Sequence, residues 1–158
     1  MLLCIYIYIY SRIKYNIISW GSSDDYLINR IFVLQKRIIR TIFKIKPRDS
    51  CKSLFREHNI LTVPSIIIYE CAKYVFKHNF LFKRNSDFHQ YDTRNRNTIT
   101  YSKHTTTLFE SSPHYLCSRI FNSLPEEIRE QKSLYSFQNS LKYFLIRSCY
   151  YKINDYLQ

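Results

Sequence analysis

Glycine and proline are scarce in this chain, and their scarcity limits its possible folds more than any other feature. The 158 residues include one Gly and four Pro. Tight turns between strands depend on these residues, so a many-stranded sandwich or barrel would lack the turns it needs. Apolar residues make up 46% of the chain, which is too apolar for full disorder. We therefore expect a packed, all-α protein whose length suits one domain.

The strongest helical pattern follows a group of candidate N-cap residues, Ser22 to Asp25. Six apolar residues then recur three or four positions apart: Leu27, Ile31, Leu34, Ile38, Ile42 and Ile45. This spacing is typical of the buried face of an amphipathic helix. We expect Pro47 to end the helix, because proline removes a backbone donor.

Shorter helical patterns follow, and together they predict how the chain is organised. Further helices are expected after Ser50, after Thr62 with Pro64, after Ser112 with Pro113, after Pro125 and after Ser133. The stretch between them, from about 83 to 112, is polar and has no periodicity. The pattern predicts an apolar N-terminal segment (1–20), a basic helical lobe (21–84), a polar loop (85–112) and a C-terminal helical lobe (113–158).

The N-terminal segment contains a strict Ile/Tyr alternation from Ile5 to Tyr10. Alternation with a period of two predicts a strand, so we expect a strand-like extension that has no partner strand. The apolar run is much shorter than the ~20 residues of a membrane span, and it lacks the basic region of a signal peptide. We therefore expect no membrane anchor.

The cysteines and histidines give no sign of a metal site. Five scattered cysteines with no C-x-x-C pair fit a disulfide framework poorly, so we expect reduced thiols in an intracellular protein, nuclear or cytoplasmic. The nearest candidate for a metal-binding pair is His114 with Cys117, and no second pair follows at the spacing of a zinc finger. No metal or other cofactor is predicted.

Two carboxylate pairs invite a catalytic interpretation, because adjacent acids can hold the Mg²⁺ ions of a nucleotidyl transferase. Asp24 and Asp25 directly precede the long helical pattern, where aspartate satisfies free backbone N–H groups. Glu126 and Glu127 follow Pro125 in the same way. A single glycine also makes a Gly-rich phosphate loop impossible. We interpret both pairs as helix starts and expect no catalysis from this chain alone.

Positive charge is concentrated in one part of the sequence. Nine basic residues lie between positions 30 and 56 against one acid, Asp49, so this part carries 9 − 1 = +8 of the net charge of +12: Arg30, Lys36, Arg37, Arg40, Lys44, Lys46, Arg48, Lys52 and Arg56. On the predicted helix, Arg30, Arg37 and Lys44 fall seven residues apart, with Lys36 and Arg40 beside them. Such a face can follow a phosphate backbone, which favours a nucleic acid as the partner. A solvated face that binds nothing is the alternative.

The polar loop adds Arg94 and Arg96 among Asn and Thr residues. These side chains suit hydrogen bonds to phosphates and base edges, and Tyr91 and Tyr101 could stack on unpaired bases. The alternative is a hydrophilic loop with aromatic anchors. The predicted nucleic-acid-binding residues are Arg30, Lys36, Arg37, Arg40, Lys44, Arg48, Arg94 and Arg96.

Six segments in order resemble the C-terminal end of reverse transcriptases from jockey-like non-LTR retrotransposons. They are WGSS at 20–23, LQKRIIR at 34–40, PRDSC at 47–51 followed by Leu54 and Phe55, NILTVPS at 59–65, YDTRN at 91–95 and NSLPEEI at 122–128. The resemblance runs from about Ser11 to Leu157. The Ile/Tyr run at the start departs from it and suggests a truncated or decayed copy.

This resemblance implies a segment that follows the polymerase palm, in the thumb or just beyond it, where helices grip the template–primer duplex. The endonuclease and the metal-binding acids of the polymerase precede the matching region in such elements, so the resemblance implies no activity for this chain. It makes Lys36, Arg37, Arg40 and Arg48 the candidate phosphate contacts, with Arg94 as the loop contact. The partner that the resemblance implies is RNA or an RNA–DNA hybrid, bound through its backbone. A helical protein-interaction module or a non-functional gene fragment is the competing interpretation.

Overall fold

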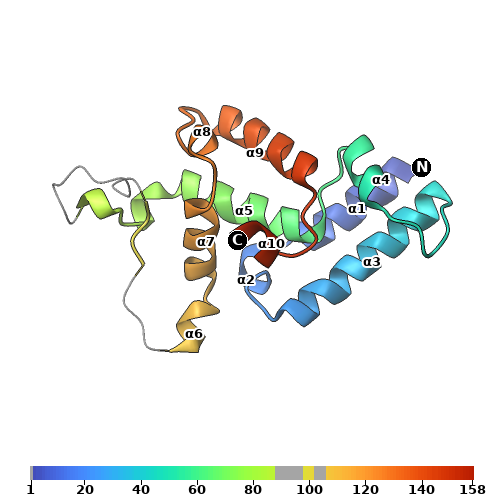
Figure 1. The fold of residues 1–158 in the computed structure, drawn as a ribbon, viewed down its shortest axis with the longest axis horizontal. Helices are drawn as coiled ribbons and strands as arrows, with labels where there is room; N and C mark the ends of the chain where they lie inside the picture. The colour runs from blue at the N-terminus through green and yellow to red at the C-terminus, as the bar shows by residue number, and fades with distance from the viewer. Residues whose placement is uncertain (1, 88–97, 102–105) are drawn as a thin grey trace.

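The computed structural model describes residues 2–87, 98–101 and 106–158 of the chain (Figure 1). Helices dominate these residues, and the pairing of strands is limited there to one isolated bridge between Arg84 and Ile99. The predicted all-α fold is therefore confirmed. In chain order the elements are α1 (Leu2–Lys14), α2 (Ile17–Trp20), α3 (Asp25–Phe43), α4 (Lys52–Glu57), α5 (Val63–Lys77), η1 (Asn79–Leu81), η2 (Asn85–Asp87), α6 (Thr107–Glu110), α7 (Pro113–Asn122), α8 (Glu126–Arg129), α9 (Leu134–Ser148) and α10 (Asn154–Leu157).

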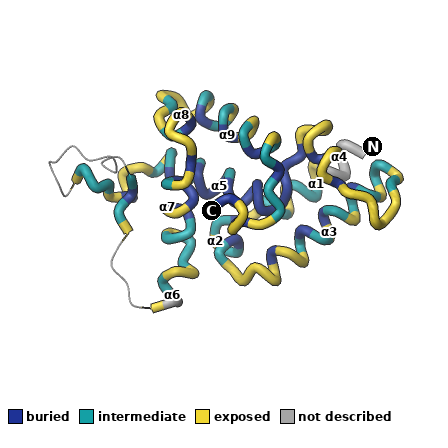
Figure 2. The backbone as a smooth tube through the Cα atoms, viewed as in Figure 1, coloured by how far each residue is buried: buried dark blue, intermediate teal, exposed yellow. Residues whose placement is uncertain are grey.

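Helix α5 lies at the centre of the core and is apolar on nearly every side. It packs against α2, α3, α7 and α9, and Figure 1 shows α9 and α3 on opposite sides of it. Its residues Ile66, Ile67, Ile68, Cys71 and Ala72 have no exposed surface. Burying each of these isoleucine side chains contributes roughly 1.5–3 kcal/mol. Both predicted lobes supply residues to the same core cluster, which Figure 2 shows as the dark blue interior.

Four predicted helix starts are confirmed by their N-caps. The side-chain oxygens of Asp24, Thr62, Ser112 and Ser133 accept hydrogen bonds from the N–H of a residue two or three positions ahead, at 3.1–3.3 Å. The end of α3 differs from the prediction. The helix ends at Phe43, ahead of Pro47, because Lys44 adopts a left-handed conformation with φ 52°. The N–H groups of Lys44 and Ile45 then both donate to the Arg40 carbonyl, which closes the helix.

The prediction of a strand at the N-terminus is wrong, since the Ile/Tyr run lies inside α1. A helix bonds its backbone groups within the segment, whereas a strand without a partner would leave them unpaired. The helix also gives the end of this segment a buried side, where Tyr10 and Ile13 pack against the core three residues apart.

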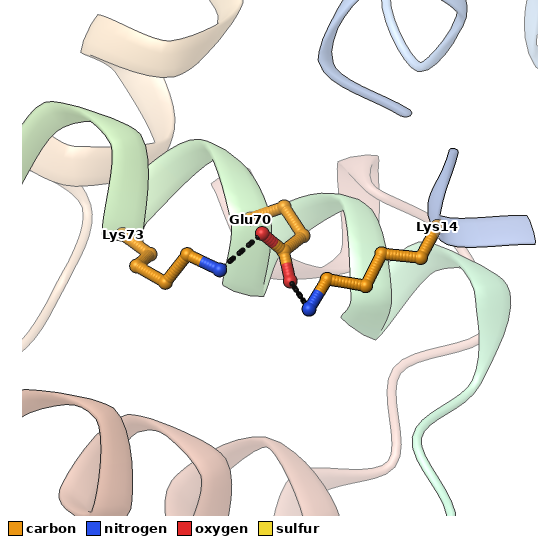
Figure 3. A network of polar contacts seen from close by, with 3 residues as sticks. All are labelled: Lys14, Glu70 and Lys73. Atoms are coloured by element: carbon orange, nitrogen blue, oxygen red, sulfur yellow. Dashed lines mark ion pairs between the residues drawn. The ribbon is translucent and has the colours of Figure 1, made fainter. Parts of the chain in front are cut away.

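A buried carboxylate ties α1 to the central helix (Figure 3). Glu70 of α5 has a side chain that is 8% exposed, and its two oxygens lie 3.0 Å from Lys14 Nζ and 2.5 Å from Lys73 Nζ. Two ammonium groups around one carboxylate offset the cost of burying its charge. Burial and the negative charge of Glu70 both raise the pKa of the neighbouring Tyr10 and Tyr69.

A buried glutamine on α3 fixes the start of α5. The Nε2 atom of Gln35 donates to the Leu61 carbonyl at 2.9 Å, and its Oε1 atom accepts from the Val63 N–H at 2.9 Å. Both backbone groups are buried and would otherwise lack partners. The pair of hydrogen bonds therefore sets which side of α3 faces the core.

The single glycine of the chain stands where α2 meets α5. A Cβ atom at Gly21 would lie 2.5 Å from the Ile17 carbonyl oxygen and 3.0 Å from Cγ2 of Ile67. Any larger residue would push the two helices apart, so this position requires glycine for space.

Part of the predicted polar loop is ordered against α7. Ile99 is buried, and Asn122 bonds both its N–H (2.9 Å) and its carbonyl (3.0 Å). The short helix α6 also falls within the range 85–112. Among the residues that the structure describes, no helix combines the length and apolar character that crossing a bilayer requires.

Candidate nucleic-acid interface

Helix α3 carries most of the predicted binding residues, and its buried face determines where they point. The residues turned to the core are Ile28, Phe32, Gln35 and Ile39, spaced four, three and four apart. The predicted buried stripe is therefore wrong in part: Leu27 is 46% exposed and Leu34 is 54% exposed. The true stripe lies one residue further along the chain, which rotates the helix by ~100° relative to the prediction.

Arg30, Arg37 and Lys44 are exposed and lie opposite the buried stripe. We call these three residues the cation row. Seven residues of an α-helix advance by ~10 Å and return to nearly the same side, so Arg30 and Arg37 stand ~10 Å apart. Lys44 continues the row directly after the helix, at its C-cap. Figure 2 shows the exposed positions of α3 alternating with buried ones along the helix.

Lys36 and Arg40 point away from the cation row and are half-buried. The Lys36 ammonium lies 4.5 Å from the ring centroid of Phe32 and 5.6 Å from that of Tyr151. Arg40 donates from Nε (3.3 Å) and Nη2 (3.0 Å) to the main-chain carbonyl of Asp49. Arg40 thereby holds the connection between α3 and α4 against the helix. Packing and main-chain hydrogen bonds, rather than acidic side chains, position these two cations.

A surface groove of about 630 Å³ opens at the C-terminal end of α3. It is lined by Arg37, Arg40, Thr41, Lys44, Ile45 and Pro47, and these residues include no carboxylate. The groove joins the end of the cation row to Arg40. Arg48, in the connection that follows, is exposed.

Two further cations, which we did not include among the predicted binding residues, lie on α4. Lys52 and Arg56 are exposed, and the positive charges of both are close enough to Cys149 to influence the pKa of its thiol. Burial raises the pKa of the Cys149 thiol, and the two cations oppose that rise. Cys149 precedes Tyr151, whose ring faces Lys36. Lys36, Lys52 and Arg56 thus gather around the turn that follows α9, although 20 residues of sequence separate the first from the last.

Few acidic side chains lie near the cations of this surface. The ion pairs found among the described residues join Glu70 to Lys14 and Lys73, and none of these residues lines the groove. Asp25 accepts a hydrogen bond from Asn154 at 3.0 Å. Between Tyr26 and Arg48 the sequence has seven cations and no acid. Its charges therefore remain available to an external anion.

The predicted loop residues cannot be added to this interface. Tyr91, Arg94 and Arg96 lie outside the described residues. Tyr101 is described and 42% exposed, but its ring centroid lies 5.4 Å from that of Tyr115 and its hydroxyl accepts a hydrogen bond from Asn122 at 3.0 Å. Tyr101 is thus held against α7.

The carboxylate pairs considered for catalysis lie at helix starts. Asp24 caps α3, and Glu126 and Glu127 lie in the first turn of α8. No group of three or more His, Cys, Asp or Glu side chains in the described ranges is placed to hold a metal ion. The ring of His114, half of the candidate metal pair, stacks on Phe82 with centroids 4.6 Å apart.

The described cysteines are buried and unpaired: Cys51, Cys71, Cys117 and Cys149. A hydrogen bond with Cys117 and burial both raise the pKa of the Cys71 thiol well above its usual value. A protonated, buried thiol is a poor nucleophile, so this thiol pair gives no support to a covalent mechanism.

A second cavity, of about 390 Å³, lies between the first half of α3 and the C-terminal segment. Its lining carries charges of both signs, including Asp25, Asp155 and Lys152, together with the apolar Phe32 and Ile153. This mixture does not favour an anion. The cation row and the groove next to it therefore form the better candidate site.

Comparison with known proteins adds no assignment to this geometry: no protein-family model, no curated protein and no solved structure matches the chain.

Proposed function

We propose that this chain binds nucleic acid through the sugar–phosphate backbone, using the surface of α3 and the connection that follows it. The observation that carries the proposal is the stretch from Tyr26 to Arg48, which has seven cations and no acid. Three of these cations form the exposed row on α3, and Arg37 and Lys44 also border the groove at its end.

The spacing of the row suits a nucleic-acid strand. Charges ~10 Å apart on one exposed face can each meet a different phosphate of a strand. Contacts of this kind read no base sequence and release condensed counterions, which makes binding strongly dependent on salt. Lys36, Lys52 and Arg56, gathered around the turn after α9, would extend the contact beside the row.

For the origin of the chain, the proposal is a C-terminal remnant of the RNA-directed DNA polymerase of a non-LTR retrotransposon. The support is the resemblance of six ordered segments, of which LQKRIIR at 34–40 lies within α3 and carries Lys36, Arg37 and Arg40. On this proposal the chain has neither the catalytic palm nor the endonuclease. It would bind RNA or an RNA–DNA hybrid and would not polymerise by itself.

Binding to an RNA–DNA hybrid, measured from ~50 to ~300 mM salt, tests the proposal. The logarithm of the binding constant should fall linearly with the logarithm of the salt concentration. The triple variant Arg30→Gln, Arg37→Gln, Lys44→Gln should bind more weakly, with a slope reduced by about one for each lost phosphate contact.

A matched control removes three exposed cations that lie outside α3, α4 and the turn after α9: Lys77→Gln, Lys132→Gln and Lys142→Gln. Both variants lose the same net charge, so a difference between them reports the location of the contact. Equal weakening in the two variants, or no binding at the lowest salt concentration, would refute the proposal.

A further inference from the structure

Helix α3 presents a row of apolar side chains that the core uses only in part, since Ile31 packs against the core while Leu27 and Leu34 are left outside it. Leu27 and Leu34 are 46% and 54% exposed, although leucine in an amphipathic helix normally faces the core. Ile31 and Ile38, between and beyond them, are half-buried. The core instead takes the neighbouring stripe that contains Phe32.

These side chains follow a coiled-coil pattern. The spacing from one residue to the next alternates between four and three along the set Leu27, Ile31, Leu34, Ile38 and Thr41, all of which lie within α3. In heptad terms the isoleucines occupy the a positions, and Leu27, Leu34 and Thr41 occupy the d positions. Isoleucine at a with leucine at d is the combination that pairs helices two at a time. We call this set the apolar seam.

The cation row runs along one edge of the apolar seam. In the same register Arg30 and Arg37 fall at g positions, which flank the seam and choose the partner by charge, and Lys44 follows directly after the helix. The opposite flank, the e positions, consists of Ile28, Gln35 and Ile42. Ile28 and Gln35 are buried against the core, so the cationic edge is the accessible one.

From the seam and its cationic edge we infer a docking site for an acidic amphipathic α-helix of a partner protein. The helix would place its apolar residues on Leu27 and Leu34 and its glutamates or aspartates beside Arg30 and Arg37. Opposite charges at flanking positions of paired helices stabilise them, and α3 has no acid between Asp25 and Asp49 that could compete.

A second copy of this chain fits the site poorly. In an antiparallel pair the g positions of two copies face one another, which would set cation against cation. In a parallel pair the cations would face Ile28, Gln35 and Ile42, and none of these residues carries a compensating charge. The charge pattern thus selects an acidic partner over self-association.

This inference does not depend on the proposed nucleic-acid function, although the two ligands would share Arg30, Arg37 and Lys44. The acidic helix needs the apolar seam in addition, whereas a phosphate backbone does not. An acidic helix bound at the seam would therefore exclude nucleic acid from the cation row.

The test uses a synthetic peptide of about three heptads with Ile and Leu at a and d and Glu at e and g. Its control is a peptide of the same composition with the order scrambled. Fluorescence anisotropy with the full chain should give saturable binding of the patterned peptide and much weaker binding of the scrambled one. The double variant Leu27→Gln, Leu34→Gln should weaken the patterned peptide by roughly tenfold or more.

A second variant, Leu27→Ala with Leu34→Ala, preserves helix propensity and should show the same loss, which guards against a folding artefact. Affinity for an RNA–DNA hybrid should stay unchanged in both variants. Equal binding of the two peptides, full binding by both leucine variants, or self-association through the seam in place of peptide binding would overturn the inference. If the unmodified chain binds the patterned peptide but not the RNA–DNA hybrid, the proposed function is refuted and this inference is unaffected.

Discussion

Replacing Gln35 by leucine tests the orientation of α3, on which the positions of the cation row and the apolar seam both depend. In the structure the amide of Gln35 serves the Leu61 carbonyl and the Val63 N–H, each at 2.9 Å. Leucine fills a similar volume but can replace neither hydrogen bond. The substitution therefore leaves two backbone groups without partners at positions that are 4% and 0% exposed.

The size of the effect follows from these two groups. A buried polar group left without a partner costs about 1–3 kcal/mol, so two cost about 2–6 kcal/mol. Leucine returns roughly 1 kcal/mol through its extra apolar surface. We expect the free energy of unfolding to fall by about 3 kcal/mol, which for a chain of this size lowers the Tm by roughly 6–12 °C.

Urea denaturation followed by circular dichroism measures this change, and thermal unfolding gives the Tm shift. The matched control is Gln138→Leu, at a half-buried position of α9, which should change the free energy of unfolding by less than about 1 kcal/mol. A loss below about 1 kcal/mol for Gln35→Leu would mean that Gln35 does not face the α5 N-terminus. The outward positions of Arg30, Arg37, Leu27 and Leu34 would then lose their structural basis.

Three further predictions concern the core. Glu70→Ala should lower the free energy of unfolding, measured by urea denaturation, by about 1–3 kcal/mol. The loss is smaller than for a deeply buried charge that loses its partner, because Lys14 is 41% exposed and can rehydrate. Gly21→Ala should lower it by about 1–3 kcal/mol, since its Cβ would meet the Ile17 carbonyl oxygen at 2.5 Å; an unchanged Tm would contradict this close approach. Burial raises the pKa of Tyr156 above its usual 10.0, so the stability gained from its neutral form is complete below pH 10 and declines as the pH rises further. Urea denaturation between pH 8 and ~12 should show this decline, and Tyr156→Phe should reduce it.

The helix starts could be predicted from sequence because capping is local. Asp24, Thr62, Ser112 and Ser133 each bond a backbone N–H within three residues, so the signal and its partner lie in the same short segment. The exposure of Arg30 and Arg37 was predictable for a similar reason, because both lie in one helix. The prediction that Lys36 and Arg40 share their face was wrong, since these two side chains are half-buried and turned away from the row.

The face of α3 that meets the core could not be predicted, because the helix has two neighbouring apolar stripes. The stripe of Leu27 and Leu34 contains more aliphatic residues, whereas the true one includes the polar Gln35. The second stripe is selected by the hydrogen bonds of Gln35 to the backbone of Leu61 and Val63, and these two residues lie far from Gln35 in the sequence. The gathering of α4 cations near Cys149 depends on tertiary packing in the same way.

The Ile/Tyr run shows how a period of two can mislead. Its alternation fits a strand, but a strand requires a partner strand, and the described residues supply only one isolated bridge elsewhere in the chain. Within α1 the same residues satisfy their own backbone, and Tyr10, Ile13 and Lys14 meet the core and Glu70. Tertiary contacts here outweigh the local pattern.

Lysine acetylation in the presence of an RNA–DNA hybrid tests the central claim most directly, because it reports which amines the hybrid covers. Lys44 and Lys46 are exposed near the end of α3, and Lys132 and Lys142 are exposed around α9, so all four react in the free chain. With the hybrid bound at low salt, the account predicts several-fold slower acetylation of Lys44 and Lys46 and unchanged rates at Lys132 and Lys142, read by mass spectrometry. Equal rates at all four lysines, or protection confined to Lys132 and Lys142, would contradict it.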